Sequence, residues 1–235
     1  MNHIMKIIIA LLFVSAITVF SQSPVVILDN VPTNRIDYGN FDPKDTVEGS
    51  LHLVTHTFGT NDCEISERIG CAKVGLRRLL AFNMTIVNAW TNNWAGPTIT
   101  SRPDLFYYDT CHQHIHLIDW SIFSLLQGSK RLTVSGKMGW CVISGSPLLI
   151  GAVPYTNVNN YCAEPYLLKG WGDTYGANAA CMWLDVTEIK PGKYTLLIQL
   201  DPKDQYGTPD DLSLVIKMTD TSVEVVESNG RGKRK

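Results

Sequence analysis

Apolar and polar residues alternate over several short stretches of the chain, a pattern typical of strands with one buried face. The clearest stretch is 194–200, Tyr-Thr-Leu-Leu-Ile-Gln-Leu, which follows a Lys-Pro-Gly-Lys turn at 190–193. Further strands are predicted at 51–58, 79–87, 131–143, 212–226 and the start of 112–126, whose later part could instead be helical. The pattern therefore predicts a single domain of mainly β structure.

Long irregular segments separate these strands. Residues 24–50 are rich in Pro, Asp, Asn and Gly, and residues 88–97 are rich in turn formers, so both are expected to be loops. Residues 144–180 have no clear period, and a loop of that length is usually functional or cross-linked, here through Cys162. The polar and basic residues 227–235 predict a disordered tail.

The N-terminal residues have the composition of a secretory signal peptide. Lys6 precedes an apolar run of 14 residues, Ile7 to Phe20, and Ser21 follows it. A spanning helix needs about 20 residues, so cleavage is favoured over a membrane anchor. We expect a signal peptide at 1–21, a folded domain at 22–226, the tail, and a secreted, extracellular protein with no stable membrane insertion after cleavage.

Composition limits the classes of partner. Hydrophobic residues make up 45% of the 235 residues and charged residues 18%, as in a globular protein. The formal net charge is -2, and it becomes -3 when Lys6 leaves with the signal peptide. No broad basic field is present, so nucleic acid is not an expected partner.

The chain has six cysteines: Cys63, Cys71, Cys111, Cys141, Cys162 and Cys181. An even number in an exported chain predicts three disulfides. Six cysteines allow 15 pairings, and their spacing does not choose among them. A glycosylation sequon is present at Asn83-Met-Thr, but such tripeptides are frequent by chance.

Three of the six histidines lie within five residues, at His112, His114 and His116. On a strand, alternate side chains point to one face, so these imidazoles would converge and could bind one metal ion. Three protein ligands leave a position open, as in catalytic rather than structural sites, and imidazole suits copper, zinc, iron and nickel. His52 and His56 are interpreted as structural or solvated.

From Arg102 onward the chain resembles the catalytic domain of the lysyl oxidase family. The resemblance covers about 100 residues and rests on several blocks in the family's order. These are Arg102-Pro103, Cys-His-Gln-His-Ile-His at 111–116, Asp119, Gly136-Lys137, Asp-Thr-Tyr-Gly-Ala at 173–177, Cys-Met-Trp-Leu-Asp-Val-Thr at 181–187 and Lys-Pro-Gly-Lys-Tyr at 190–194. Upstream, residues 51–94 match more loosely, mainly through Cys63 and Cys71.

The resemblance implies a role for individual residues. Copper would be bound by His112, His114 and His116. Lys137 and Tyr175 would form the family's cofactor, a lysine tyrosylquinone. It also implies three disulfides: Cys63–Cys111, Cys71–Cys181 and Cys141–Cys162. The sequence departs from animal members of the family at Ile115, usually tyrosine, and after Asp119, where Trp120 and Ser121 replace acidic and aromatic residues.

The activity implied by the resemblance is the oxidation of primary amines, including lysine side chains of proteins. The amine becomes an aldehyde, O2 is consumed, and hydrogen peroxide and ammonia are released. Expected partners are a lysine-containing protein or a small primary amine, and O2. A base must remove a proton from the carbon next to nitrogen. Asp119 is a candidate for this base, and it is equally a candidate hydrogen-bond acceptor for an imidazole N–H.

Two other functions are compatible with the sequence. A non-catalytic secreted protein that binds copper or the extracellular matrix could retain the same fold. A secreted zinc hydrolase could use the same histidines, but a paired acidic motif such as His-Glu-x-x-His does not accompany them.

Overall fold

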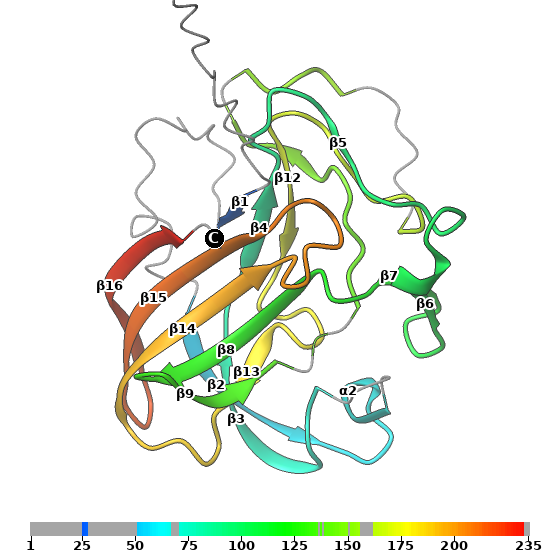
Figure 1. Cartoon of the computed structure of the whole chain (residues 1–235). Helices are drawn as coiled ribbons and strands as arrows, with labels where there is room; N and C mark the ends of the chain where they lie inside the picture. The colour runs from blue at the N-terminus through cyan, green and yellow to red at the C-terminus, as the bar shows by residue number, and fades with distance from the viewer. Residues whose placement is uncertain are drawn as a thin grey trace, which may run out of the picture.

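The computed structural model describes residues 25–27, 51–66, 71–135, 137, 139–149, 151–155 and 162–232. Strands dominate the described residues, which confirms the expectation of a mainly β fold (Figure 1). The predicted signal peptide, 1–21, and most of the predicted loop 24–50 lie outside them. Within the described residues, no helix is long and apolar enough to cross a membrane.

The elements follow one another in a fixed order along the chain. The first half contains β1 (Val25–Ile27), β2 (His52–Phe58), α2 (Cys63–Ser66), β3 (Gly75–Ala81), β4 (Met84–Val87), β5 (Trp94–Ala95), η1 (Pro103–Leu105), β6 (Phe106–Asp109), β7 (His114–Leu117) and β8 (Ser121–Gln127). The second half contains β9 (Lys130–Val134), β10 (Ser146–Pro147), β11 (Tyr166–Leu167), β12 (Trp171–Tyr175), β13 (Trp183–Asp185), β14 (Gly192–Leu200), β15 (Asp210–Met218) and β16 (Val223–Gly232).

The largest sheet has five antiparallel strands in the order β16-β15-β14-β8-β9. Buried and half-buried residues alternate along β14, so one face of this strand points into the core. The buried residues are Tyr194, Leu196, Ile198 and Leu200. This strand starts at Gly192, directly after the predicted turn. The alternating sequence at 194–200 therefore forms the central strand of the sheet.

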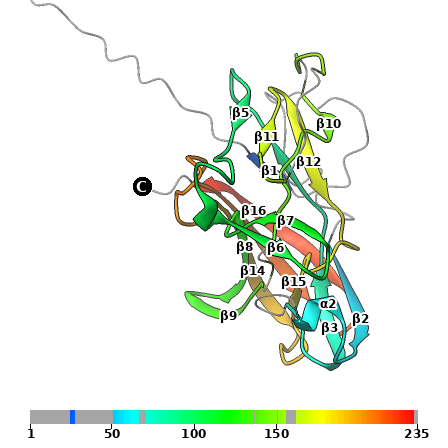
Figure 2. The same ribbon diagram turned by 90° about the vertical axis from the view of Figure 1, so that its right-hand side faces the viewer.

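Four smaller groups of strands surround this sheet. One has the order β13-β3-β2, and a second has the order β1-β4-β12-β10. The other two are pairs: β11 with β5, and β6 with β7 in a hairpin. In Figure 1, β2, β3 and β13 lie behind the five-stranded sheet, and the β6–β7 hairpin projects to one side. Figure 2 shows the hairpin from the front, with α2 beside β3.

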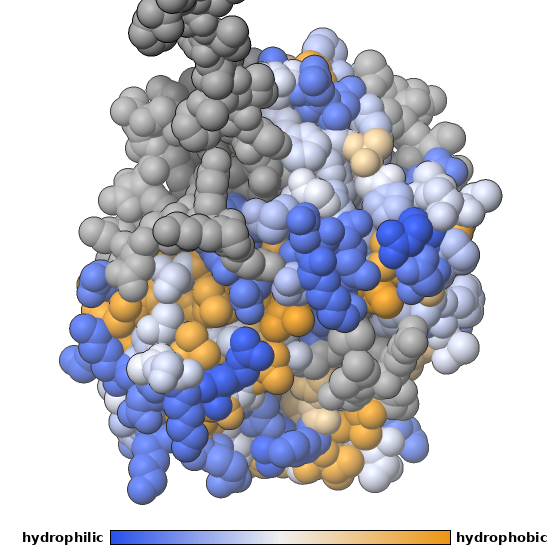
Figure 3. All heavy atoms as spheres, viewed as in Figure 1, coloured by the Kyte–Doolittle hydropathy of each residue, from blue (hydrophilic) through white to orange (hydrophobic). Residues whose placement is uncertain are grey.

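One main hydrophobic core joins these sheets. Its largest members are fully buried and come from different elements, for example Phe82, Trp120, Phe123 and Trp140. Phe123 packs edge-on against both Phe82 and Trp140. A second, small cluster of Phe58, Leu79, Ala81 and Trp183 lies on the opposite face of β3. On the face shown in Figure 3, hydrophobic residues are interspersed with hydrophilic ones.

The structure corrects three expectations about local structure. Residues 121–127 form a strand, so the helical alternative for that region is wrong. Residues 144–180 contain three short strands, β10, β11 and β12, because pairing with distant strands supplies hydrogen bonds that the local sequence does not indicate. The predicted tail is not irregular from residue 227: β16 continues to Gly232 and pairs with β15.

The predicted strand boundaries also change in two places. The segment 79–87 is divided between β3 and β4, with a break at Phe82 and Asn83. The segment 131–143 forms a strand to Val134, and its described residues beyond that make one isolated bridge, at Trp140. This irregular portion carries Lys137 and contributes to the site described below.

The three disulfides are Cys63–Cys111, Cys71–Cys181 and Cys141–Cys162. This pairing confirms the one that the family resemblance implied. The first bond joins α2 to the start of the histidine segment. The second joins the segment before β3 to the segment before β13, and the third joins the irregular stretch after Gly139 to residue 162.

Replacing Phe123 by alanine should lower the free energy of unfolding by about 3–5 kcal/mol, because a fully buried aromatic ring is removed between two others. Urea unfolding would measure the loss. Val134→Ala is the control, since Val134 is 48% exposed in β9. Equal stability of the two variants would contradict the position given to Phe123 in the core.

Candidate active site

The β6–β7 hairpin carries the three histidines. His114 and His116 lie on β7, opposite Asp109 and Tyr107 of β6, and His112 lies in the connecting loop. Gln113 has a φ of 60°, a left-handed conformation that turns the chain between His112 and the strand. The loop returns His112 toward the face that carries the other two imidazoles, whose ring centres lie 5.6–6.0 Å from that of His112.

Each imidazole has an oxygen atom beside its Nδ1. His112 Nδ1 lies 2.8 Å from Asp109 Oδ2, and His114 Nδ1 lies 2.9 Å from the carbonyl oxygen of His112. His116 Nδ1 lies 3.0 Å from the Tyr107 hydroxyl. An imidazole whose Nδ1 carries the proton presents its Nε2 lone pair to a metal, so these contacts select one orientation for all three rings.

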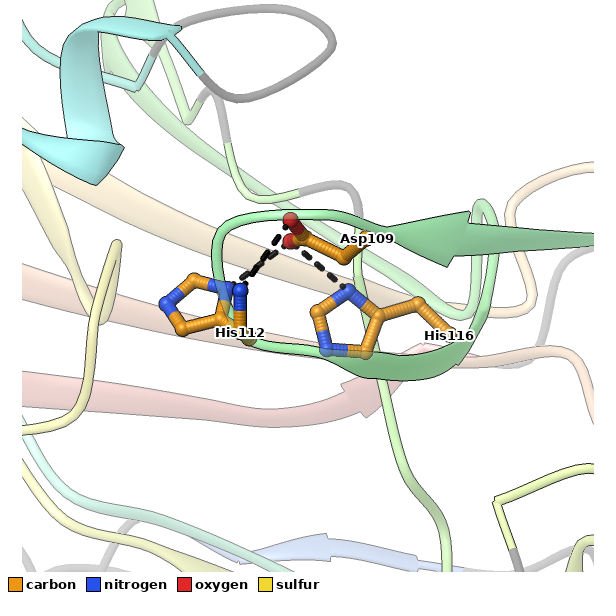
Figure 4. Close-up of side chains that lie close together, drawn as sticks. All are labelled: Asp109, His112 and His116. Carbon is orange, nitrogen blue, oxygen red and sulfur yellow. Dashed lines mark hydrogen bonds and ion pairs between the residues drawn. The ribbon is translucent and has the colours of Figure 1, made fainter.

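The Nε2 atoms of His114 and His116 face each other at 2.8 Å. When both rings are neutral and carry their proton on Nδ1, their Nε2 lone pairs point at each other. A cation bound by both nitrogens stabilises this arrangement. Asp109, His112 and His116 also form a group whose potential ligand atoms all lie within 4.8 Å of one another (Figure 4). The donor set of three imidazoles beside one carboxylate therefore fits a divalent transition metal.

Asp109 is the carboxylate that holds the histidines in position. It is 4% exposed, and its Oδ2 lies 2.8 Å from His112 Nδ1 and 3.4 Å from His116 Nδ1. Its Oδ1 accepts the backbone N–H of Cys111 at 2.8 Å. Asp109 thus orients two rings and the loop between them, which is the role of a carboxylate behind metal-binding histidines.

His116 is 6% exposed. Burial lowers its pKa from 6.5 to about 4, and the neighbouring His114 contributes in the same direction. The imidazole is therefore neutral at pH 7, the form that binds metal.

The irregular segment 139–145 lies against the histidine strand on one side. Leu117 and Trp140 exchange two backbone hydrogen bonds, at 2.7 and 3.0 Å. This brings Gly139 so close to His116 that a Cβ atom on Gly139 would lie 2.0 Å from His116 Nδ1. Glycine is required at 139 because the imidazole occupies the space of a side chain.

The same segment lies against β12 on its other side. Tyr175 donates its phenolic O–H to the Cys141 carbonyl at 2.8 Å, Asp173 Oδ2 accepts the Ile143 N–H at 3.2 Å, and Gly145 donates to the Gly172 carbonyl at 3.0 Å. These contacts run in antiparallel order. Segment 139–145 therefore connects the strand that carries His116 to the strand that carries Tyr175.

This arrangement also determines the position of Lys137. Its Nζ donates to the Ala180 carbonyl at 3.2 Å, which extends the same antiparallel order beyond Tyr175. Nζ also lies 4.9 Å from the ring centre of Trp140 and 5.7 Å from that of Tyr175. Trp140 packs edge-on against Tyr175, with ring centres 4.8 Å apart. Lys137 and Tyr175 are 38 positions apart in the sequence. Both lie against the ring of Trp140.

Asp173 and Tyr175 are two positions apart on β12, and their side chains interact directly. Burial raises the pKa of Asp173 from 3.8 to about 6. Burial, followed by the negative charge of Asp173, raises the pKa of Tyr175 well above 10. Of these two acids, Tyr175 is the one whose ring lies beside Lys137, with its ring centre 5.7 Å from Nζ.

Asp119 has a different environment. Its Oδ2 accepts a hydrogen bond from Lys203 Nζ at 2.6 Å, and its side chain is 13% exposed. It has a φ of 53° in the turn between β7 and β8. The carboxylate found beside the imidazole Nδ1 atoms is Asp109, not Asp119.

The sequence of most of the domain matches one family model. The lysyl oxidase model matches residues 57–212. The chain belongs to the lysyl oxidase family.

Curated relatives have names from the same family. Human lysyl oxidase homolog 1 is 28% identical over 135 residues, which are 54% of this chain and 22% of that protein. Human protein-lysine 6-oxidase is 30% identical over 133 residues, 54% of this chain and 30% of that protein. Zebrafish (Danio rerio) lysyl oxidase homolog 2B is 28% identical over 142 residues, 60% and 18% of the two chains. The matched part spans less than a third of each of these relatives.

The lysyl oxidase residues expected from sequence fall into three groups in the structure. His112, His114 and His116 have adjacent rings, Lys137 and Tyr175 form a second pair, and Asp119 pairs with Lys203. Sequence reasoning assigned no role to Asp109, Asp173 or Gly139. For Asp173 a signal existed, since positions 173 and 175 share a face of a strand.

Replacing Asp109 by asparagine should weaken the binding of added Cu²⁺ about 10–100-fold if this is a metal site, because the Nδ1 partner of His112 and His116 loses its charge while its shape is kept. Competition titration of the purified chain against a chromophoric chelator would measure the affinity. Asp104→Asn is the control, since Asp104 is an exposed carboxylate that pairs with Arg102. Unchanged affinity in Asp109→Asn would show that this carboxylate does not support the metal ligands.

Asp173→Asn should change how stability depends on pH. The folded state raises the pKa of Asp173 from 3.8 to about 6, so the folded state binds this proton more tightly than the unfolded state does. The resulting stabilisation is present below about pH 4 and is lost as the pH rises through about 6. Between pH 4 and pH 7 the wild type should lose up to about 3 kcal/mol relative to the variant.

Urea unfolding of both proteins at the two pH values would measure this difference. The other titrating groups contribute equally to wild type and variant, so they cancel when the two pH dependences are compared. A pH dependence that is the same in both proteins would mean that Asp173 is not held in its protonated form by the fold.

Proposed function

We propose that this member of the lysyl oxidase family is a secreted copper- and quinone-dependent amine oxidase. It would convert primary amines, including the lysine side chains of proteins, to aldehydes, with reduction of O2 to hydrogen peroxide and release of ammonia. The observation that carries the proposal is the approach of Lys137 Nζ to within 5.7 Å of the Tyr175 ring centre. The two residues that the family joins covalently are therefore neighbours here.

In this proposal His112, His114 and His116 hold copper. Three imidazoles suit Cu²⁺, and the low pKa of His116 keeps that ring neutral for binding. The space for the ring is provided by the absence of a side chain at Gly139. Asp109 keeps the rings in one orientation, so the site is prepared before the metal binds.

Lys137 and Tyr175 form the lysine tyrosylquinone in this proposal. The copper and the quinone would together supply the two-electron oxidation of the amine. The protein's own contribution is to position and desolvate: Trp140 packs against the ring of Tyr175, and the Cys141 backbone fixes its hydroxyl. The Ala180 carbonyl holds the nitrogen of Lys137 beside that ring.

The reaction requires a base that removes a proton from the carbon next to the substrate nitrogen. Asp119 and Asp173 are the two candidates. Asp119 is committed to Lys203 at 2.6 Å. Asp173 interacts with Tyr175 itself, and burial raises its pKa to about 6. A general base works best when its pKa lies near the pH of the reaction. We therefore favour Asp173 for this step, with Asp119 as the second candidate.

The remaining assignments concern location and partners. Three disulfides support an oxidising compartment, in agreement with a signal peptide at 1–21 and an extracellular protein. The name protein-lysine 6-oxidase, given to relatives, supports lysine-containing proteins as substrates, alongside small primary amines. O2 is the co-substrate, and no role for nucleic acid or stable membrane insertion is proposed.

Lys137→Arg tests the proposal directly. The guanidinium keeps the positive charge but cannot form the cofactor, so redox-cycling quinone staining and peroxide release from a primary amine should both fall to background. Bound copper, measured by metal analysis, should remain at the wild-type level. Lys130→Arg is the control, because Lys130 is exposed at the start of β9 and should behave as wild type.

Two results would contradict the proposal. Peroxide release at the wild-type rate from Lys137→Arg would exclude this lysine from the cofactor. A copper-loaded wild type that shows neither quinone staining nor amine oxidation would indicate a copper-binding protein without this activity.

A further inference from the structure

A pocket of about 530 Å³ lies over the small hydrophobic cluster of β2, β3 and β13, and none of its lining residues is among the site residues assigned above. Its apolar wall includes Val54 and Phe58 of β2 and Trp183 of β13. His52 and His56 project from the same face of β2, because alternate residues of a strand share a face. The volume is in the range of pockets that bind ligands.

Two other walls of the pocket are attached to the candidate active site. Glu64 belongs to α2, and its neighbour Cys63 is bonded to Cys111, the residue before His112. The Cα atoms of Cys63 and Cys111 are 5.7 Å apart, and adjacent Cα atoms are 3.8 Å apart. The Cα atoms of Glu64 and His112 therefore lie within about 13 Å of each other.

The opposite wall is formed by Ala177 and Asn178, which lie two and three residues after Tyr175 in the chain. Asn178 is three residues from Tyr175, so their Cα atoms are at most about 11 Å apart. The Asn83 side chain holds this loop by accepting the Ala177 N–H at 2.6 Å. The pocket is thus adjacent both to the segment that carries His112 and to the loop that follows Tyr175.

The chemistry of the lining selects a class of ligand. Among the lining residues, Glu64 is the one with a formal charge at pH 7, and none is lysine or arginine. Such a pocket disfavours an acidic ligand. Imidazole and amide groups at the rim can bond to peptide groups, while Val54, Phe58 and Trp183 offer contact to an apolar side chain. The lining therefore suits a neutral or basic polypeptide that carries an apolar residue.

We propose that this pocket binds an apolar or aromatic side chain of the protein substrate, located within about four residues of the lysine that is oxidised. This upper limit follows from the distances above, since four residues of an extended chain cover about 13–14 Å. The inference rests on the proposed amine oxidase activity and adds a specificity: polypeptides with an apolar residue at that distance are preferred over isolated amines.

The test uses the copper-loaded full chain and synthetic peptides with one lysine in a Gly/Ser background. A phenylalanine is moved from one to six residues away from the lysine on either side. For the wild type, kcat/KM for peroxide release should be about tenfold higher when phenylalanine is one to four residues away than in the peptide without it. Equal values along the series would overturn the proposal.

Variants connect this preference to the pocket. His56→Trp and Asn178→Trp would fill it from opposite walls, and in each the ratio of kcat/KM with and without phenylalanine should fall to about one. Taking the ratio within one variant cancels any general loss of active enzyme. Thr57→Trp is the matched control, because Thr57 is exposed on the other face of β2 and should keep the ratio. A preference retained in both pocket variants would overturn the assignment.

A binding measurement separates failure of this inference from failure of the proposed function. Fluorescein-labelled peptides of the same series, with norleucine in place of lysine, are titrated with each protein and followed by anisotropy. If the wild type oxidises no amine, the proposed activity fails. The pocket assignment is then supported by phenylalanine-dependent binding that His56→Trp loses and Thr57→Trp keeps, and it is overturned by binding that does not depend on phenylalanine.

Discussion

The site depends on one short segment, residues 139–145, which is hydrogen-bonded on both sides. Toward β7, Trp140 exchanges two backbone hydrogen bonds with Leu117. Toward β12, the Cys141 carbonyl accepts a hydrogen bond from the Tyr175 hydroxyl. Without this double pairing, the histidines and the tyrosine would belong to separate sheets with no fixed relation. Trp140, fully buried and in contact with Lys137, Tyr175 and Phe123, ties the segment to the main core.

Electrostatics within the site follow from burial. His116 and Asp173 are buried and Tyr175 is partly buried, so each charged form is disfavoured and each group is held neutral over a wider pH range than in solution. Asp109 differs from these three groups, because its buried carboxylate is surrounded by N–H groups of the histidine loop. A group of histidines backed by one hydrogen-bonded carboxylate is suited to binding a metal, while a weak acid beside a tyrosine is suited to proton transfer.

The disulfides explain how short elements can hold this arrangement. Cys63–Cys111 anchors the histidine loop to α2, and Cys71–Cys181 anchors the loop after Tyr175 to the segment before β3. Both bonds also limit the position of the walls of the pocket beside β2. The same covalent links that stabilise the candidate active site therefore determine how close that pocket lies to it.

The sequence by itself determined the mainly β fold, because alternation at 194–200 and similar stretches reflects one buried face. It also determined the family, since its motifs are local in the chain, and through the family the three cysteine pairs. The strand at 121–127 was ambiguous because a short apolar run satisfies either period. Pairing with β14 and β9 decided it, and pairing with β15 likewise extended β16 through polar residues to Gly232.

Only the tertiary structure decided which groups act together. Asp109 and Gly139 have no distinctive sequence environment, because their roles arise from a neighbour brought close by the fold, the imidazole of His116. The position of Asp173 beside Tyr175 follows from the strand period, but its hydrogen bond to the backbone of segment 139–145 does not. Contacts between residues distant in the chain depend on the register of several strands at once. A local pattern records which face of a strand is buried, but not which strand it will meet.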